Sequence, residues 1–281
     1  MTEDDGRETA EDGARELRVH GVHAVLALWV HRPQDVRRVY VTEARLPRFG
    51  AILQECARRR VPYRVVGDDD LERLTESVHH EGVAVVARER PQPTLPEVLA
   101  RLADAPHATL CWLDGVSNPH NVGSLLRTAA HFGVPALVGS ERMPRLSPSA
   151  CRVAEGAAET VDLVRVPRTG EAFAALREAG FRIVGTDGRD GRGLFRAALP
   201  QRVVVVLGGE VSGMSPDVRA LLDEVVRIPG TGAVDSLNVA AAAAVVLAEL
   251  WRRVSAGSAG GRSSRGGGRG RSGRRRSPPS P

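Results

Sequence analysis

The chain has no lysine, few aromatic residues and few cysteines. All 39 basic residues are therefore arginine, whose planar guanidinium suits phosphate, although a biased gene composition explains the lack of lysine more simply. Aromatic residues make up 4% of the 281 residues, so Ala, Val and Leu must form most of the core. Cys56, Cys111 and Cys151 lie far apart and in no CxxC pair, which argues against disulfides and against a metal site.

Long apolar runs are also missing. The longest run, Val239 to Ala248, is about half of what a membrane-spanning helix needs. The N-terminus is acidic and shows no signal-peptide pattern. Together with the scarce cysteines, this predicts a cytoplasmic protein that makes no membrane contact.

The net charge of +5 is unevenly distributed. Residues 1–17 carry seven acids and two arginines, whereas residues 255–281 carry seven arginines and no acid. Both ends are too poor in apolar residues to form a core. We therefore expect a disordered acidic N-terminus over 1–17 and a disordered Arg/Gly/Ser tail over 255–281. The basic tail favours a polyanionic partner.

Between these ends the pattern indicates two α/β units. Residues 18–90 are long enough for a small domain, and the proline-rich stretch from Pro91 to Pro96 begins a linker over 91–107. Over 108–254, strand-like and helix-like segments alternate, which predicts a mostly parallel sheet with helices on both faces. The expected strands lie near Leu110–Asp114, Ala136–Val138, Val161–Val166, Phe181–Thr186, Val203–Leu207 and Val225–Ile228.

The helices expected in the second unit share helical spacing and plausible end signals. A glycine follows two of them, and Ser215-Pro216-Asp217 is a good helix start. The expected helices are Gly123–Phe132, Ser149–Ala158, Glu171–Ala179, Pro216–Asp223 and Leu237–Arg253.

Three polar or glycine-rich segments each follow an expected strand. They run from Asn118 to Arg127, from Gly208 to Gly213 and from Pro229 to Asn238. Because ligands bind at the carboxyl ends of strands in open parallel sheets, we expect these segments to converge on one site. The glycine loop is neither a dinucleotide loop nor a P-loop, since Glu210 replaces the middle glycine and no Gly-Lys-Ser/Thr follows.

Several polar side chains in these segments have a structural and a functional interpretation. Asn121, Ser236 and Asn238 could each cap a helix, or bind a substrate or cofactor. Arg127 could be a solvated helix residue or a fork that holds phosphate. The run Ala240–Ala244 could be an ordinary buried helix or a flat surface for a second subunit.

Taken together, the motifs N-P-H-N-V-G-S-L-L-R, L-G-G-E-V-S-G-M-S and I-P-G-T-G…D-S-L-N-V-A resemble the SpoU (TrmH) family of RNA ribose 2'-O-methyltransferases, in the SPOUT superfamily. The layout over residues 18–254 is most similar to that of 23S rRNA guanosine-2'-O-methyltransferases. The resemblance implies an α/β fold: a small L30e-like RNA-binding domain ahead of an α/β-knot methyltransferase domain. It also implies S-adenosylmethionine as cofactor, RNA as substrate, and a homodimer.

The resemblance also assigns roles to residues. The implied catalytic set is Asn121, Arg127, Glu210, Ser236 and Asn238. The implied cofactor-binding set, which acts largely through backbone groups, is Leu207, Gly208, Gly209, Gly213, Ile228, Pro229, Gly232, Leu237 and Asn238.

Two departures weaken transfer of the RNA target. Asn118 stands where the rRNA enzymes commonly have Asp, and Asp235 where Glu is common. We expect Arg127 to fix an RNA phosphate and stabilise developing negative charge, and His120 to be only a loop residue. The predicted activity is methyl transfer to a ribose of rRNA. The alternatives are a tRNA methyltransferase, a methylase protecting against a ribosome-directed antibiotic, and a non-catalytic RNA-binding protein.

Overall fold

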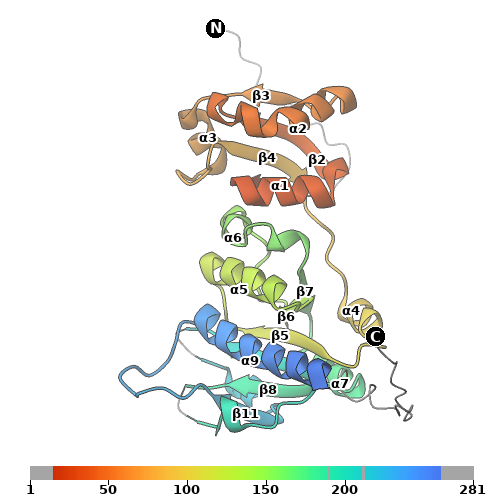
Figure 1. The fold of residues 1–281 in the computed structure, drawn as a ribbon, viewed down its shortest axis with the longest axis vertical. Helices are drawn as coiled ribbons and strands as arrows, with labels where there is room; N and C mark the ends of the chain where they lie inside the picture. Colours follow the sequence, from red (N-terminus) through yellow and green to blue (C-terminus); the bar gives the residue numbers. More distant parts are fainter. Residues whose placement is uncertain (1–14, 189, 211–212, 261–281) are drawn as a thin grey trace, which may run out of the picture.

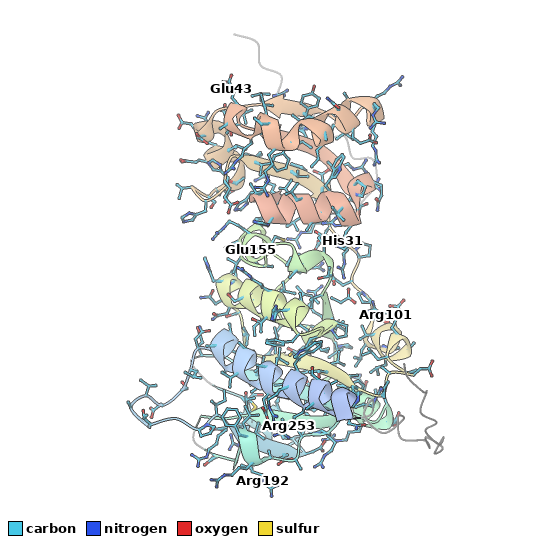
Figure 2. The ribbon with its side chains drawn as sticks, viewed as in Figure 1. His31, Glu43, Arg101, Glu155, Arg192 and Arg253 are labelled. Atoms are coloured by element: carbon cyan, nitrogen blue, oxygen red, sulfur yellow. The ribbon has the colours of Figure 1, made fainter. Side chains whose placement is uncertain are left out.

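The structure is a computed structural model that describes residues 15–188, 190–210 and 213–260. Two α/β domains follow one another along the long axis of the molecule, with α1 of the first facing α6 of the second (Figure 1). Charged side chains cover both domains: Glu43 lies at the far end of the first, Arg192 at the far end of the second, and His31 and Glu155 between them (Figure 2). Within the described residues, no helix is long and apolar enough to cross a membrane.

The N-terminal domain is built on a four-stranded mixed sheet in the order β1-β4-β2-β3. Only β2 and β3 pair in parallel. The apolar faces of α1 and α2 join a single core with one side of this sheet. The elements are β1 (Glu16–His20), α1 (Val22–His31), β2 (Val36–Val41), α2 (Leu46–Arg59), β3 (Tyr63–Val65), α3 (Asp68–Thr75) and β4 (Val83–Arg88).

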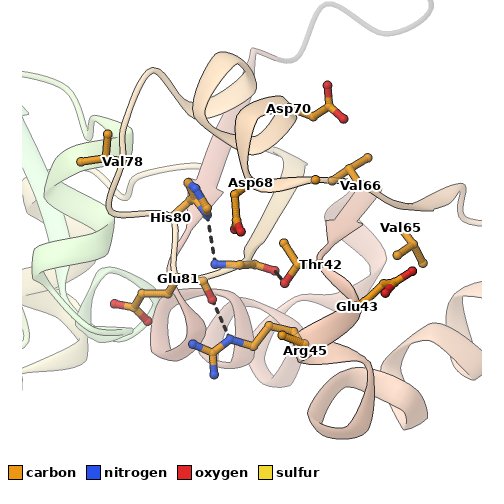
Figure 3. A pocket seen from close by; sticks show the side chains of 13 residues that line it. Thr42, Glu43, Arg45, Val65, Val66, Asp68, Asp70, Val78, His80 and Glu81 are labelled. Atoms are coloured by element: carbon orange, nitrogen blue, oxygen red, sulfur yellow. Dashed lines mark hydrogen bonds between the residues drawn. The ribbon is translucent and has the colours of Figure 1, made fainter.

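One local prediction for this domain was wrong. Strand β1 begins at Glu16, inside the expected disordered segment, because Glu16 and Leu17 pair with Arg88 and Ala87 of β4. The apolar stretch after Gly21 forms helix α1. Helix α3 begins at Asp68, and Asp68 and Asp70 both lie in its first turn (Figure 3). Residues 1–14 lie outside the described part of the chain.

The linker is partly helical, which the proline-rich sequence did not predict. Helix α4 (Leu95–Arg101) begins at a capping box in which Thr94 and Glu97 bond each other's backbone groups. Pro96 is compatible with this helix because it stands in the first turn, where no N–H is needed. Leu95 and Val98 are buried against the second domain, so this part of the linker is packed.

The second domain has a seven-stranded sheet in the order β7-β6-β5-β10-β8-β11-β9, and all its pairings are parallel. The predicted parallel sheet is therefore confirmed, and β9 is a short addition that the sequence did not indicate. The strands are β5 (Ala108–Asp114), β6 (Ala136–Ser140), β7 (Asp162–Val166), β8 (Arg182–Thr186), β9 (Arg192–Gly193), β10 (Arg202–Gly208) and β11 (Glu224–Arg227).

Helices cover both faces of this sheet, as predicted. In β10, Val203 and Val205 join the core formed by α5, α6 and α9, whereas Val204 and Val206 join the core formed by α4, α7 and α8. This alternation follows from the two-residue period of a strand. The helices are α5 (Pro119–His131), α6 (Pro148–Val153), α7 (Thr169–Glu178), α8 (Pro216–Arg219) and α9 (Val239–Gly260).

The helix boundaries differ from the prediction at four places. Helix α8 ends at Arg219, four residues before the expected Asp223. Helix α5 begins at Pro119, four residues before the expected start, since a proline at the first position is favourable. The expected helix over 149–158 is the shorter α6, followed by a 3-10 turn at Ala157–Glu159. Helix α9 begins at Val239 and continues to Gly260, into the expected tail. The remainder of the tail, 261–281, lies outside the described residues.

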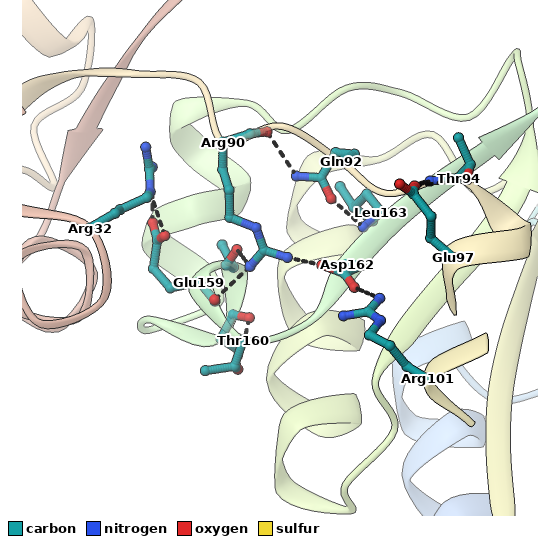
Figure 4. A network of polar contacts seen from close by, with 12 residues as sticks. Arg32, Arg90, Gln92, Thr94, Glu97, Arg101, Glu159, Thr160, Asp162 and Leu163 are labelled. Atoms are coloured by element: carbon teal, nitrogen blue, oxygen red, sulfur yellow. Dashed lines mark hydrogen bonds and ion pairs between the residues drawn. The ribbon is translucent and has the colours of Figure 1, made fainter. Parts of the chain in front are cut away.

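Buried charged groups connect the two domains (Figure 4). Arg32, at the end of α1, donates to both carboxylate oxygens of Glu159, at 2.6 and 3.1 Å. Arg90, in the chain leaving β4, donates to the Glu159 carbonyl at 2.5 Å. Asp162 accepts from Arg90 and from Arg101 of α4. We call these five residues the interdomain network.

Candidate active site

A cavity of about 730 Å³ opens at the carboxyl ends of β8, β10 and β11. This is the edge of a parallel sheet at which ligands are expected. Eight of the nine predicted cofactor-binding residues line the cavity; Asn238 does not. The eight are Leu207, Gly208, Gly209, Gly213, Ile228, Pro229, Gly232 and Leu237.

The glycines after β10 are required by close backbone contacts. A Cβ on Gly208 would lie 2.5 Å from the carbonyl carbon of Gly213, and one on Gly209 would lie 2.6 Å from the Gly115 oxygen. Gly213 donates its N–H to the Gly209 carbonyl at 2.9 Å and has a positive φ of 64°. The loop therefore presents backbone to the cavity with little side-chain bulk.

Asp114, at the end of β5, holds both ends of this loop. Its carbonyl accepts from the Gly209 N–H at 2.8 Å, and its carboxylate accepts from the Ser215 N–H at 2.6 Å. From the sequence, Asp114 was predicted only to end a strand. Its position at the sheet edge shared by two of the motifs was the sequence signal for this role.

The three motifs meet in one polar cluster, formed by Asn121, Glu210 and Asn238. The Nδ2 of Asn121 donates to Glu210 Oε1 at 2.6 Å. The Nδ2 of Asn238 donates to the same oxygen at 2.7 Å and to Asn121 Oδ1 at 3.1 Å. One carboxylate oxygen thus receives two amide donors from elements far apart in the sequence. Such charge-assisted bonds are stronger than neutral ones.

Capping explains one of these asparagines but not the other. Asn118 caps α5 by accepting from the His120 N–H at 2.8 Å, so Asn121 is not the cap and its buried side chain faces Glu210. Asn238 serves both purposes: its Oδ1 accepts from the Ala240 N–H at 2.9 Å while its Nδ2 donates to Glu210.

The two other predicted catalytic residues lie outside the cluster. Ser236 lines the cavity. Arg127 lies six residues beyond Asn121 on α5, about 9 Å further along the helix axis. Its exposed side chain forms an ion pair with Glu155 at 2.9 Å. His120 is exposed on the first turn of α5 and is not part of the cavity wall.

One segment of the cavity wall was not predicted from the sequence. Thr186 ends β8, and Asp187 and Gly188 follow it; all three line the cavity together with the third motif. A Cβ on Gly188 would lie 2.5 Å from the Asp235 carbonyl oxygen, so the two loops are in direct contact. The sequence signal was the Asp-Gly pair directly after an expected strand, on the same sheet edge as the other motifs.

The cysteines are not candidates for nucleophilic chemistry. Burial raises the pKa of Cys111 and of Cys151 to about 12, and burial also raises that of Cys56. A thiol that stays protonated at neutral pH is a poor nucleophile.

The fold and the site define an RNA methyltransferase that uses S-adenosylmethionine. Residues 108–248 match the SpoU rRNA methylase family, and residues 18–93 match the RNA 2'-O ribose methyltransferase substrate-binding family. The chain belongs to the SpoU rRNA methylase family.

Named relatives and solved structures agree with this assignment. The 23S rRNA (guanosine-2'-O-)-methyltransferase RlmB of Pseudomonas putida is 35% identical over 240 residues, covering 84% of this chain and 96% of that protein. The uncharacterised tRNA/rRNA methyltransferase YfiF of Escherichia coli O157:H7 is also 35% identical over 240 residues, covering 85% and 69%. The crystal structure of the SpoU methyltransferase AviRb from Streptomyces viridochromogenes with AdoMet has a TM-score of 0.71 and 26% identity, covering 86% and 91%.

The cavity fits this cofactor. Its volume lies within the range of about 300–1,000 Å³ that is usual for small-molecule sites. Glycine backbone forms part of its wall, and a Cβ at Gly208 or Gly188 would collide with the loops that shape it. When bound, S-adenosylmethionine supplies an activated methyl group on a positively charged sulfur. Glu210 in the wall provides a carboxylate that suits a cationic ligand, whereas the Asp187 carboxylate is paired with Arg219.

Proposed function

We propose that this protein methylates ribose 2'-hydroxyls of ribosomal RNA, with 23S rRNA as the target class. The observation that carries the proposal is the cluster of Asn121, Glu210 and Asn238 beside the glycine-walled cavity. A non-catalytic RNA-binding protein would have no need to hold these three side chains together next to such a cavity. The names of RlmB and YfiF support rRNA, and such a substrate would place the protein in the cytoplasm.

In this proposal the cavity wall holds the cofactor through backbone groups of Leu207, Gly209, Ile228 and Leu237. The amides of Asn121 and Asn238 fix Glu210 at the edge of the cavity. Holding a reacting group in one geometry supplies much of the rate of a displacement reaction, because little orientational entropy is left to lose.

Arg127 is proposed to act from the RNA side. Its guanidinium is always charged, so it is a poor base but a good ligand for phosphate. The ion pair with Glu155 is exposed to solvent, so it contributes little to stability and exchanges easily for an RNA phosphate. There Arg127 would stabilise the negative charge that develops on the attacking oxygen.

We also propose that the active form is a homodimer. Trp251 on α9 is 53% exposed, and Val234 and Leu237 near its start are 71% and 47% exposed. The Ala-rich first turns of α9 leave a flat surface beside them, which a second subunit could cover closely. Light scattering of the full chain at micromolar concentration should give twice the monomer mass; a monomer would contradict the proposal.

The remaining roles go to the ends of the chain. The N-terminal domain is proposed to choose the target, and the Arg tail, which has no aromatic residue, to add salt-sensitive phosphate contacts. Deleting 255–281 should weaken RNA binding and flatten its salt dependence without moving the modified nucleotide. A shift of the modified position would contradict this division.

The direct test is methylation of 23S rRNA transcribed in vitro, with the cofactor labelled in its methyl group. Ribose methylation blocks alkaline cleavage, so digestion should release a labelled alkali-resistant dinucleotide. Label on a base, or label only on tRNA in a parallel reaction, would overturn the proposal.

A further inference from the structure

The two faces of the N-terminal sheet are covered very differently. Helices α1 and α2 both pack on the face that carries Val39, Val41 and Val85. Helix α3 contacts β1 and β4, and α6 of the second domain also contacts β1. On the face opposite α1 and α2, the side chains of Arg38, Tyr40 and Arg64 from β2 and β3 are exposed or half-buried, so this part of the sheet is open to solvent or to a partner.

The strand register identifies the exposed side chains of this face. Arg18 of β1 and Arg38 of β2 both pair with Val86 of β4, from opposite sides. Tyr40 of β2 pairs with Arg64 of β3. Because side chains alternate along a strand, Arg18, Arg38, Tyr40 and Arg64 project from the same face. We call these four residues the arginine–tyrosine face.

These side chains are available for binding. All three arginines are exposed, and Tyr40 is half-buried. Arg38 donates to the Tyr40 hydroxyl at 3.4 Å, which keeps the guanidinium beside the ring. Arg18 forms only a long, exposed ion pair of 3.7 Å with Glu76, and such a pair is readily exchanged for another anion.

We propose that the arginine–tyrosine face contacts the RNA substrate, with phosphates on the arginines and an unpaired base stacked on Tyr40. This inference rests on the proposed function. An open sheet surface with cations around one aromatic ring combines the two groups that bind single-stranded RNA. A protein partner would favour a larger apolar patch. Strand β4 places two aliphatic side chains beside these four residues, Val86 between Arg18 and Arg38 and Ala84 next to Tyr40, so the apolar area of this face is small.

Two charge-matched variants test the arginines. Arg38→Gln with Arg64→Gln removes two charges from the face. The control, Arg48→Gln with Arg58→Gln, removes two charges from exposed positions on α2, across the sheet. Filter binding of in vitro 23S rRNA over 50–200 mM salt should show at least about tenfold weaker binding for the first variant. Its log Kd against log salt should be flatter by roughly 1.5, as for two lost phosphate contacts.

Tyr40 gives an independent readout. Tyr40→Ala should weaken binding at least about fivefold through lost stacking, whereas Tyr40→Phe, which keeps the ring, should bind like the wild type. Equal losses of RNA affinity in the face variant and its α2 control would show that only the net charge of the protein matters, and would overturn the inference. So would unchanged RNA binding, or a loss of binding only to an acidic protein.

The wild type separates this inference from the proposed function. If it methylates a ribose of 23S rRNA while the face variants behave like their control, only the inference fails. If the wild type neither binds nor methylates the RNA, the proposed function fails.

Discussion

The interdomain network and the Asn121–Glu210–Asn238 cluster both gather polar side chains from distant parts of the chain, but they match charge differently. In the network, Glu159 is paired with Arg32, and Asp162 with Arg90 and Arg101. In the cluster, the two donors that the described residues give to the Glu210 carboxylate are both neutral side-chain amides.

The difference indicates that the interdomain network stabilises the fold, whereas the cluster serves ligand binding or catalysis. Arg32 and Glu159 have side chains only 6% and 4% exposed, and a buried ion must be fully paired because its desolvation is expensive. Glu210 and Asn238 are exposed, and Glu210 lines the cavity. A carboxylate that is positioned but not neutralised keeps capacity for a ligand, which a structural ion pair lacks.

The largest expected effect is the loss of stability when an ion pair of the interdomain network is broken. Arg32→Ala should lower the free energy of unfolding by about 3–5 kcal/mol, because Glu159 is left as an unpaired buried charge. Urea unfolding measures this. Arg168→Ala, which breaks an exposed ion pair with Glu171, should cost less than about 1 kcal/mol.

A double variant sharpens this result. Arg32→Met combined with Glu159→Leu removes both charges, so most of the lost stability should return. If the double variant were no more stable than Arg32→Ala, burial of an unpaired charge would not be the cause.

The next effect concerns Arg127, which belongs to neither group. Arg127→Ala should lower turnover by about 10²–10³-fold, the usual loss when one group that stabilises developing charge is removed. Cofactor affinity, measured by calorimetry, should stay within a few-fold. A large loss of cofactor affinity in a folded variant would show that Arg127 binds the cofactor and would contradict its proposed role in binding RNA.

A pH effect is expected next to the interdomain contact. Burial first, and then the charges of Arg152 and His80, lower the pKa of His20 to about 4, against the partly opposing charge of Glu81. The unfolded chain takes up the proton near pH 6.5 and the folded one only near pH 4, so stability falls as the pH drops through this window.

His20→Phe removes this titration. Both buried His20 nitrogens have no hydrogen-bond partner among the described residues, so a phenyl ring loses no bond there. Between pH 7 and pH 5 the wild type should lose about 2 kcal/mol more stability than the variant, measured by urea unfolding. Parallel curves would show that His20 does not cause the loss.

A smaller effect, on cofactor affinity, is expected when the Asn121–Glu210–Asn238 cluster is changed. Asn238→Ala removes the amide that donates hydrogen bonds to Glu210 and to Asn121. Cofactor binding should weaken about tenfold, which corresponds to the loss of one charge-assisted hydrogen bond. Asn238→Asp keeps an acceptor for the Ala240 N–H, so it should lose cofactor affinity while keeping helix α9 capped. Normal affinity in the Asp variant would limit Asn238 to capping.

The smallest effect is predicted for His120. Its side chain is exposed outside the cavity wall, so His120→Ala should change turnover by less than about twofold. A large loss would make His120 a candidate for the proton acceptor.

Much of the fold followed from local patterns. The strands of the second domain were predictable because strands buried on both faces have continuous apolar runs such as Val203 to Val206. Helix ends were less predictable. Proline at a first turn extended α5 and allowed α4, where the sequence pattern suggested a boundary or a linker.

The site was predictable in its motifs but not in its contacts. The sequence indicated that three segments lie at one sheet edge, because parallel strands bring their carboxyl ends together. It did not indicate that Asn118 rather than Asn121 caps α5, nor that Thr186 to Gly188 completes the cavity wall. The cap is a local contact between Asn118 and His120, but the direction of Asn121 toward Glu210 and the completion of the cavity wall depend on where neighbouring loops lie.

The sequence by itself determined the fold class, the family and the segments that form the site, because strand period, turn chemistry and motif spacing are properties of neighbouring residues. Only the tertiary structure decided which side chains meet. Glu210 bonds Asn121 and Asn238, which are 89 and 28 residues away, and Arg32 bonds Glu159, 127 residues away. Contacts across such separations depend on how strands and helices pack, and no local pattern encodes that packing.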